Sequence, residues 1–239
     1  MPRRTHKKRG KKRGRTKRHW PRLKERGIRG ASTSPLMNRL RSVMKFETSA
    51  VFDPNMTNAA VAVFSANGIY GPYLSSPSEN VTRVTDHQPR GFDQLAPLYD
   101  HHVVIASRIT AVFNSTDNSQ ACNVWVSLQN KSALLIEDNK FLGYAESDKT
   151  LYEVCDSSLG GKAQQVISMN CSPARFLARS KMLSDPDVKG SDGSNPAEQC
   201  FFHVGAQALD ETTNPAPLQV DIQIEYVAIF IEPRTPAIS

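Results

Sequence analysis

The strongest constraint on this sequence is that apolar residues recur at every second position of its longest hydrophobic segments. Segment 220–232, VDIQIEYVAIFIE, places one set of apolar side chains on the same face of an extended chain: Val220, Ile222, Ile224, Tyr226, Ala228 and Phe230. Asp221, Gln223 and Glu225 fall on the opposite face. A period of two with many β-branched and aromatic residues is typical of a strand with one buried face. Segments 44–53 and 105–114 alternate in the same way, so we predict a fold built on strands.

Weaker runs of the same kind fill the rest of the chain from Leu36 onward. They occupy residues 60–66, 122–129, 150–155, 163–170 and 199–208. No long amphipathic helix and no internal repeat is evident, and the turn-forming sequence STDNSQ at 115–120 predicts a hairpin between two strands. About eight antiparallel strands with long connections predict an all-β fold, either a two-sheet sandwich or a jelly roll.

Charge divides the 239-residue chain into two parts of opposite sign. Residues 1–45 contain 18 Lys and Arg and one acid, Glu25, and carry a net charge of +17. The remaining residues contain 12 Lys and Arg against 22 acids, a net charge of −10. Residues 1–30 have few aliphatic side chains, and a self-repelling segment with little to bury does not fold alone. We therefore expect a disordered basic arm over residues 1–35 and a folded domain over residues 36–239.

The basic arm suits two functions that are compatible with each other. Each Lys or Arg that approaches a phosphate releases a condensed counterion, so the arm is expected to bind nucleic acid without sequence preference. The residues expected to do so are the cations of the arm and an aromatic residue that can stack on an unpaired base: Arg3, Arg4, Lys7, Lys8, Arg9, Lys11, Lys12, Arg13, Arg15, Lys17, Arg18, Trp20, Arg22, Lys24, Arg26 and Arg29. Dense Lys and Arg clusters also act as nuclear-import signals, here Lys7, Lys8, Arg9, Lys11, Lys12, Arg13, Arg15, Lys17 and Arg18. A solvated tail without a function is the remaining alternative.

The cysteines and the hydropathy pattern bear on the cellular compartment. Cys122, Cys155, Cys171 and Cys200 form no Cys-x-x-Cys pair, so neither a zinc ribbon nor a redox motif is expected. No apolar segment follows the N-terminal charges as in a secretory signal, and no run of roughly 18 apolar residues is present to cross a membrane. We expect reduced thiols, an intracellular setting and no membrane insertion.

A search for catalytic or metal-binding patterns finds none. His87, His101, His102 and His203 include two that follow an aspartate, as in DHQPR and YDHH. Neighbouring residues of an extended strand point to opposite faces, however, so this adjacency does not create a catalytic pair. Signatures of hydrolases, metalloproteases and P-loop proteins are missing as well. The sequence therefore predicts no catalytic residue, no metal site and no cofactor.

Two long connections, residues 67–99 and 172–198, stand out between the predicted strands. They are rich in Pro and Gly, and ordered loops of this length usually serve a function or an interface. Both also contain large apolar residues, which promote aggregation when an isolated subunit exposes them. We therefore predict that they form contacts between copies of the chain, through Tyr70, Tyr73, Phe92, Leu95, Tyr99, Phe176 and Leu183.

Four segments, in order, resemble the capsid proteins of circular single-stranded DNA viruses that encode a Rep protein, the circovirus-like group. They are FSANGIYGPY (64–73), DHQPRGFDQLAPLYDHHVVIASRITAVFN (86–114), FLARSKMLSDPDVKGSDGSNPAEQCFFHVGAQ (176–207) and IEYVAIFIEP (224–233). The second is the most specific, with HQPRGFDQ at His87–Gln94 and YDHH at Tyr99–His102. Gly71, Asp86 and Pro97 depart from the family pattern, which affects the expected loop details but not the class.

The resemblance implies one eight-stranded jelly roll made of two packed four-stranded antiparallel sheets. Its strands are expected at residues 37–53, 59–66, 100–114, 121–130, 148–156, 163–171, 199–209 and 218–232. It also implies a closed icosahedral shell of about sixty copies around a single-stranded DNA genome, with assembly in the host nucleus after binding of host import receptors. A host-cell attachment factor is implied too, and the sequence does not identify it.

Two other classes of protein share some of these features. A cellular or ribosomal-type RNA-binding protein with a basic tail on a β-sandwich would have a similar arm. Such proteins usually extend basic patches over the folded surface, whereas this domain is acidic. An enzyme with a basic targeting tail would need a catalytic site, which the sequence does not indicate. We therefore favour the capsid interpretation and keep the RNA-binding protein as its alternative.

Overall fold

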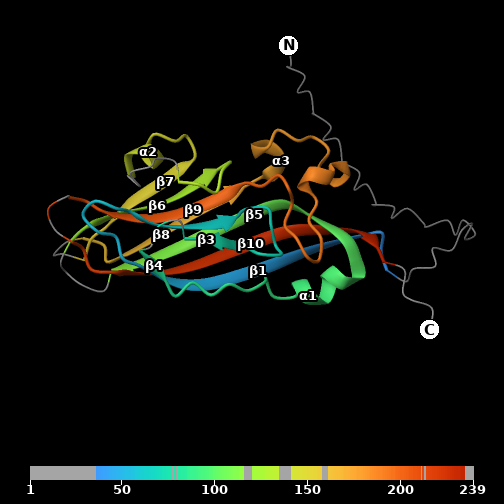
Figure 1. The fold of residues 1–239 in the computed structure, drawn as a ribbon, viewed down its shortest axis with the longest axis horizontal. Coiled ribbons are helices and arrows are strands. Elements are labelled where there is room, and N and C mark those ends of the chain that lie inside the picture. Colours follow the sequence, from blue (N-terminus) through green and yellow to red (C-terminus); the bar gives the residue numbers. More distant parts are fainter. Residues whose placement is uncertain are drawn as a thin grey trace, which may run out of the picture. The chain divides into compact units, whose positions relative to one another are not determined.

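The computed structural model describes residues 36–76, 78, 80–115, 120–134, 141–157, 161–210, 212 and 214–234. This part of the chain contains two antiparallel sheets of five strands each (Figure 1). Sheet A has the order β4 (Val81–Thr82), β1 (Arg39–Phe52), β10 (Leu218–Pro233), β5 (Tyr99–Ser115) and β8 (Gln164–Cys171). Sheet B has the order β3 (Tyr73–Ser75), β2 (Ala60–Ser65), β9 (Phe201–Ala208), β6 (Cys122–Gln129) and β7 (Thr150–Cys155).

Short helices lie in the connections between these strands. The segment between β4 and β5 contains α1 (Phe92–Leu95) and the 3₁₀ helix η1 (Ala96–Leu98). Helix α2 (Phe141–Ala145) lies between β6 and β7. The segment between β8 and β9 contains α3 (Pro173–Phe176) and two 3₁₀ helices, η2 (Met182–Ser184) and η3 (Pro186–Val188). We call this last segment, residues 172–200, the β8–β9 connection.

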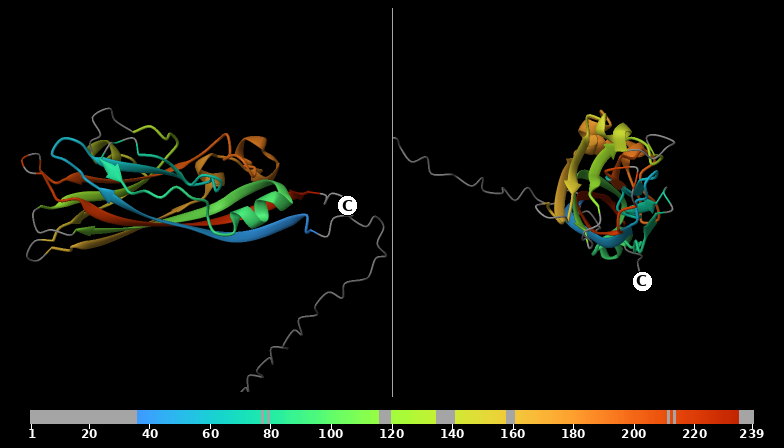
Figure 2. Two further views of the ribbon diagram at one scale, coloured as in Figure 1. Left: turned by 60° about the horizontal axis from the view of Figure 1, so that its bottom comes forward. Right: turned by 90° about the vertical axis from the view of Figure 1, so that its left-hand side faces the viewer.

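The pairing of the eight longer strands defines a jelly roll. The pairs β1–β10 and β5–β8 lie in sheet A, and the pairs β2–β9 and β6–β7 lie in sheet B. The first strand along the chain thus pairs with the last, the second with the last but one, and so on inward. A long ribbon of paired strands that passes alternately from one sheet to the other is the jelly-roll arrangement. The two views of Figure 2 show the resulting double-layered body from the side and from one end.

All eight strands expected from the sequence are present, and two details of the prediction are wrong. Each sheet has five strands rather than four, because the short strands β3 and β4 add to the edges formed by β2 and β1. The predicted hairpin at 115–120 is also absent. Strands β5 and β6, which flank it, belong to different sheets and do not pair with each other. Turn-forming residues indicate that the chain reverses direction, but they do not specify which sheet receives the next strand.

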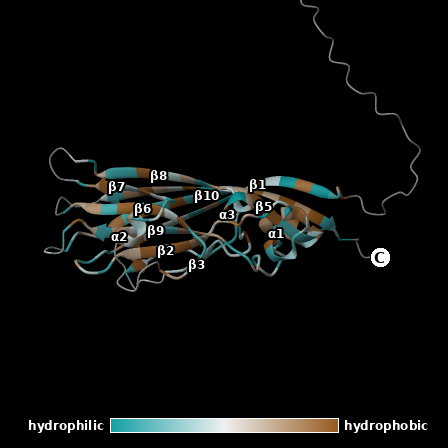
Figure 3. Cartoon of the chain, turned by 90° about the horizontal axis from the view of Figure 1, so that it is seen from above, coloured by the Kyte–Doolittle hydropathy of each residue, from teal (hydrophilic) through white to brown (hydrophobic). Residues whose placement is uncertain are grey.

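The core lies between the two sheets and is built from the apolar faces that the alternation predicts. Phe46, Phe113, Phe202 and Tyr226 come from four different strands and have no exposed surface. Figure 3 shows hydrophobic and hydrophilic residues alternating along β1. Each large apolar side chain buried in this way contributes about 1.5–3 kcal/mol. The Tyr226 hydroxyl also donates a hydrogen bond of 2.7 Å to the carbonyl oxygen of Ser65, which joins the two sheets.

The outer face of sheet B is covered by the segment around α2. Trp125 of β6 packs against the rings of Phe141 and Tyr144, with ring centroids 5.4 and 5.3 Å apart. Gly205 of β9 lies beside the indole of Trp125, where a Cβ atom would collide with the ring. The Tyr144 hydroxyl lies 3.0 Å from Nδ1 of His203. This layer explains why sheet B is buried on both faces over β2, β6 and β9.

The outer face of sheet A is only partly covered. At one end, Met182 and Val188 of the β8–β9 connection pack against Val103 and Ile231. Further along the same face, the strands present exposed side chains, polar ones interrupted by valines. This region of sheet A is therefore open to contact with other molecules.

Candidate functional site

All residues predicted to bind nucleic acid or an import receptor lie in residues 1–35, outside the described residues. This holds for the basic cluster Lys7–Arg18 and for Trp20. Both predictions therefore stay predictions. The described domain begins at Leu36, and its own surface can be compared with the predicted interface.

Phe92 and Tyr99 correct the predicted interface, because both are buried within the subunit. Their exposed fractions are 1% and 3%. Phe92 lies edge-on to His102, with ring centroids 5.5 Å apart. Tyr99 packs against Phe230 at 5.8 Å. A side chain that is enclosed by its own domain has little surface to offer a neighbour, so the burial of both residues argues against their place in the predicted interface. The sequence argument treated the whole 67–99 connection as a surface loop, but its last part folds back onto the core.

The other five predicted interface residues differ in their exposure. Tyr73, Leu95 and Phe176 are half-buried and pack on the main core, and Leu183 packs on the smaller cluster beneath the β8–β9 connection. Tyr70 is 39% exposed and remains available for a contact with another molecule. The premise that an isolated subunit exposes all of these groups is therefore wrong.

The structure exposes several apolar side chains that the interface prediction missed. Val43 and Val166 on the open face of sheet A are 61% and 56% exposed. A second group lies on β7, an edge strand of sheet B, and on α2: Leu142, Leu151, Tyr152 and Val154. Both valines occupy outward positions of an alternating strand, where a polar residue is expected. An apolar residue on the polar face of a strand is the sequence signal that could have found them.

Ion pairs fix the shape of the β8–β9 connection. Nη2 of Arg179 donates a hydrogen bond of 2.6 Å to Oε2 of Glu198, and Nη1 lies 3.3 Å from Oδ2 of Asp185. The hydrogen bond to Glu198 is the main cause of the raised pKa of Arg179. Arg179 thus joins the early part of the connection to Glu198 near its end.

A second group of ion pairs attaches this connection to sheet A. Lys189 contacts Glu232 at 2.8 Å, and Nδ1 of His101 contacts the other oxygen of the same carboxylate at 2.7 Å. Hydrogen bonds, first from Lys189 and then from His101, lower the pKa of Glu232. Arg234 extends the group by pairing with Asp100 and Asp192, each at 2.9 Å. The connection is thus a fixed part of the domain surface.

Two histidines of the domain, His102 and His203, are buried, and each lies close to backbone hydrogen-bonding groups. Burial lowers the pKa of His102 and of His203 to about 4. His102 forms a bridge with Gly190 through two backbone hydrogen bonds of 2.9 Å, and Nε2 of His203 lies 2.8 Å from the carbonyl oxygen of Lys131. Within the residues that the structure describes, no group of His, Cys, Asp and Glu side chains is arranged to hold a metal ion.

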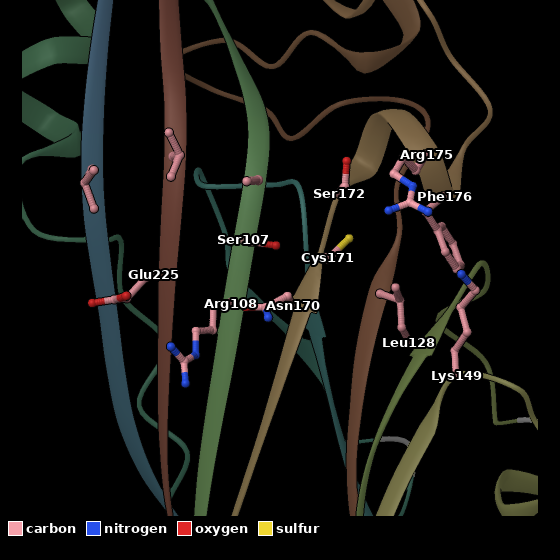
Figure 4. Close-up of a pocket in the computed structure, with 13 residues that line it drawn as sticks. Ser107, Arg108, Leu128, Lys149, Asn170, Cys171, Ser172, Arg175, Phe176 and Glu225 are labelled. Atoms are coloured by element: carbon pink, nitrogen blue, oxygen red, sulfur yellow. The ribbon is translucent and has the colours of Figure 1, made fainter. Parts of the chain in front are cut away.

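A cleft of about 680 Å³ lies between the open face of sheet A and α3 (Figure 4). Its lining includes the cations Arg108, Lys149 and Arg175. The acid in this lining is Glu225, which is paired with Lys45 at 2.9 Å. Figure 4 shows Arg108 and Arg175 on opposite sides of the cleft. In a domain of net negative charge, this cleft therefore carries a local excess of positive charge.

Comparisons with known proteins do not identify a family. No family model and no curated protein matches the chain. Similar solved structures include Mud crab tombus-like virus, at 16% identity and a TM-score of 0.45, covering 85% of this chain and 94% of that chain. Broad Bean Stain Virus matches at 10% identity and a TM-score of 0.46, covering 86% and 94%. Tobacco necrosis virus matches at 12% and 0.45, covering 85% and 87%.

These similar structures are all structures of viruses, but their identities and TM-scores are low. The assignment of the jelly roll therefore rests on the strand pairing alone. Among the described residues, no helix has the length and hydropathy needed to cross a membrane.

Proposed function

We propose that this chain is a viral capsid protein that assembles into a small icosahedral shell. The observation that carries the proposal is the separation of charge: residues 1–45 carry +17, whereas the remainder carries −10. A container needs positive charge on the side that faces its nucleic acid. The same charge on the body would attract nucleic acid to the outside and would repel neighbouring subunits.

The jelly roll supports a role in assembly. Its strands use their apolar faces for the domain's own core, so contacts between copies have to come from connections and outer faces. Tyr70, the valines of sheet A and the apolar side chains of β7 are available for this purpose. Distinct patches that meet around rotation axes give a closed shell. Nothing in the site geometry favours catalysis, and the proposed role is structural.

The arm is proposed to package the genome. Residues 1–35 contain 15 Lys and Arg and one acid, a net charge of +14 on each arm. A shell of about sixty copies would therefore hold about eight hundred positive charges, which neutralise a large share of the phosphates of a small genome by counterion release. The arm has no motif that recognises a nucleotide sequence. We therefore expect packaging to depend on the charge of the nucleic acid and on whether it is single-stranded.

The kind of genome and the nuclear step rest on the sequence resemblance. Segments 86–114 and 176–207 resemble the capsid proteins of circular Rep-encoding DNA viruses, which supports single-stranded DNA as cargo. The basic cluster Lys7–Arg18 supports import into the host nucleus before assembly. Fusion of residues 1–45 to a large inert fluorescent protein tests the import step by itself, and a fusion that stays in the cytoplasm would contradict it.

Expression of the full chain, followed by electron microscopy and nuclease digestion, tests the main proposal. We expect closed particles of uniform size that protect nucleic acid from the nuclease. A chain that stays monomeric at every protein and salt concentration would contradict the capsid role. Discrete monomeric complexes with RNA would instead support the RNA-binding alternative.

A further inference from the structure

Two cysteines that are far apart in the sequence come together at the base of the β8–β9 connection. Cys171 is the last residue of β8 in sheet A, and Cys200 directly precedes β9 in sheet B. Their Sγ atoms are 3.6 Å apart, and both thiols are free. A disulfide needs an S–S distance of about 2 Å, so a small side-chain movement would suffice to form the bond. The bond would close the connection on itself and link the two sheets.

Cys171 is also part of the lining of the basic cleft. Figure 4 shows its sulfur in the space between β8 and Leu128, with Ser172 and Arg175 following along the chain. Cys171 retains 3% of its surface, whereas Cys200 is fully buried. Both thiols are buried, but only Cys171 lines the cleft, so Cys171 is the thiol that a small local opening would present to a reagent in the cleft. The cations Arg108, Lys149 and Arg175 line the same cleft, so anionic reagents are favoured there.

We propose that Cys171 and Cys200 form a thiol–disulfide exchange site for anionic small-molecule disulfides, with the cleft as the docking site and a Cys171–Cys200 disulfide as the product. The inference depends on the chemistry of the folded domain and does not require that the chain form a shell.

The exchange proceeds in two successive thiol–disulfide exchange reactions. The Cys171 thiolate attacks one sulfur of the reagent, here oxidised glutathione, which gives a mixed disulfide and releases one glutathione thiolate. Cys200 then loses its proton, and its thiolate attacks Sγ of Cys171. This releases the second glutathione thiolate and forms the protein disulfide. Two protein thiols are oxidised to a disulfide and one reagent disulfide is reduced; the two protons lost by the protein are taken up, through solvent, by the two released glutathione thiolates, which become thiols.

The two cysteines have different roles because their surroundings differ. The hydrogen bond with Cys171, together with burial, raises the pKa of Cys200, so Cys200 is not suited to attack the reagent first. Its place as the second, resolving thiol rests on its Sγ atom lying 3.6 Å from that of Cys171. The other pair provides an internal comparison. Cys122 and Cys155 are direct partners in the register of β6 and β7, and burial raises the pKa of Cys122 to about 12. Neither of them lines the cleft, so they should react more slowly.

The test uses the full chain with oxidised glutathione, and cystamine serves as a cationic disulfide of similar reactivity. Peptide mapping should find the Cys171–Cys200 disulfide before any Cys122–Cys155 disulfide. Oxidation should raise Tm by about 10 °C, because it closes a loop of roughly thirty residues. In the Cys200→Ser variant the reaction should stop at one glutathionyl group on Cys171.

Charge variants test whether oxidised glutathione binds in the cleft before it reacts, or only needs access to the Cys171 thiol. Arg108→Gln with Arg175→Gln should slow the reaction with oxidised glutathione by about fivefold and should not slow the reaction with cystamine. Lys131→Gln with Lys162→Gln removes the same charge from exposed positions outside the cleft lining and should leave both rates unchanged. A folded wild-type chain in which Cys171 stays reduced would overturn the proposal, as would equal slowing by the two double variants.

Discussion

Arg179 donates a 2.6 Å hydrogen bond to Glu198 across the β8–β9 connection, and the same guanidinium contacts Asp185 at 3.3 Å. These contacts hold a segment that contains only short helices against the jelly roll. We predict that Arg179→Gln leaves the fold intact but loosens this connection, because three carboxylates, those of Asp185, Asp187 and Glu198, lose their common partner. Hydrogen exchange across residues 172–199 should become several-fold faster, with β1 and β10 unaffected. Lys162→Gln is the matched control, and equal exchange in the two variants would contradict this role.

Gly205 is expected to tolerate no side chain, because a Cβ atom would collide with the Trp125 ring. Gly205→Ala should therefore lower the free energy of unfolding by about 1–3 kcal/mol, the usual cost of overpacking. At Gly193, by contrast, a Cβ atom would have no described neighbour within 4 Å. Gly193→Ala should be close to neutral in the same urea titration. Equal effects of the two substitutions would show that the packing of Trp125 does not decide the cost.

Acid should destabilise the domain through its buried histidines. The pKa of His102 and of His203 is about 4 in the folded state, lowered by burial from 6.5. The unfolded chain therefore binds more protons between pH 6.5 and pH 4, and stability is complete above this window and declines as the pH falls through it. Each histidine should contribute a loss of about 3 kcal/mol at most.

Urea titrations at pH 7 and pH 5 check the histidine prediction. The lowered carboxylate pKa of Glu232 affects stability mainly below this window. The His203→Gln variant should lose part of the decline between the two pH values. A variant that keeps the full decline would exclude His203 as a source of the acid sensitivity.

The interface prediction, corrected for burial, now rests on exposed residues of the 67–99 connection. Tyr70→Asp with Leu98→Asp places two charges on residues that are 39% and 40% exposed, so the subunit should fold but form smaller species. Mass photometry measures the size distribution. Leu209→Asp, on an exposed apolar residue in a different connection, is the comparison. If Leu209→Asp prevents assembly and Tyr70→Asp with Leu98→Asp does not, the subunit contacts lie outside the 67–99 connection.

Binding of single-stranded DNA should depend on the arm and on salt. For the full chain, we expect the affinity to fall by about 10³-fold or more between about 50 mM and about 200 mM salt. Residues 36–239, which keep β1 whole, should bind weakly without the arm, because their 15 Lys and Arg against 22 acids give a net charge of −7. Fluorescence anisotropy with a labelled oligonucleotide measures both. A body that binds as tightly as the full chain at physiological salt would exclude the arm as the main site.

The sequence by itself determined the strands and the distribution of charge. The alternation of apolar residues located all eight long strands, including Arg39–Phe52 and Leu218–Pro233, because a half-buried strand leaves a period of two in its own residues. The net charges of the arm and of the body follow directly from composition. Both are local properties, and they need no knowledge of which segments meet.

Only the tertiary structure decided which groups lie side by side. It placed β5 and β6 in different sheets, buried Phe92 and Tyr99, and brought Cys171 within 3.6 Å of Cys200. These relationships join residues that are distant in the chain, and their energy depends on the packing of whole sheets rather than on any local pattern. A connection rich in Pro and Gly has the same sequence pattern whether its apolar side chains face a neighbouring subunit or pack on the core of their own domain. Here Phe92 and Tyr99 pack on their own domain, because the folded sheets leave apolar surface that these side chains cover.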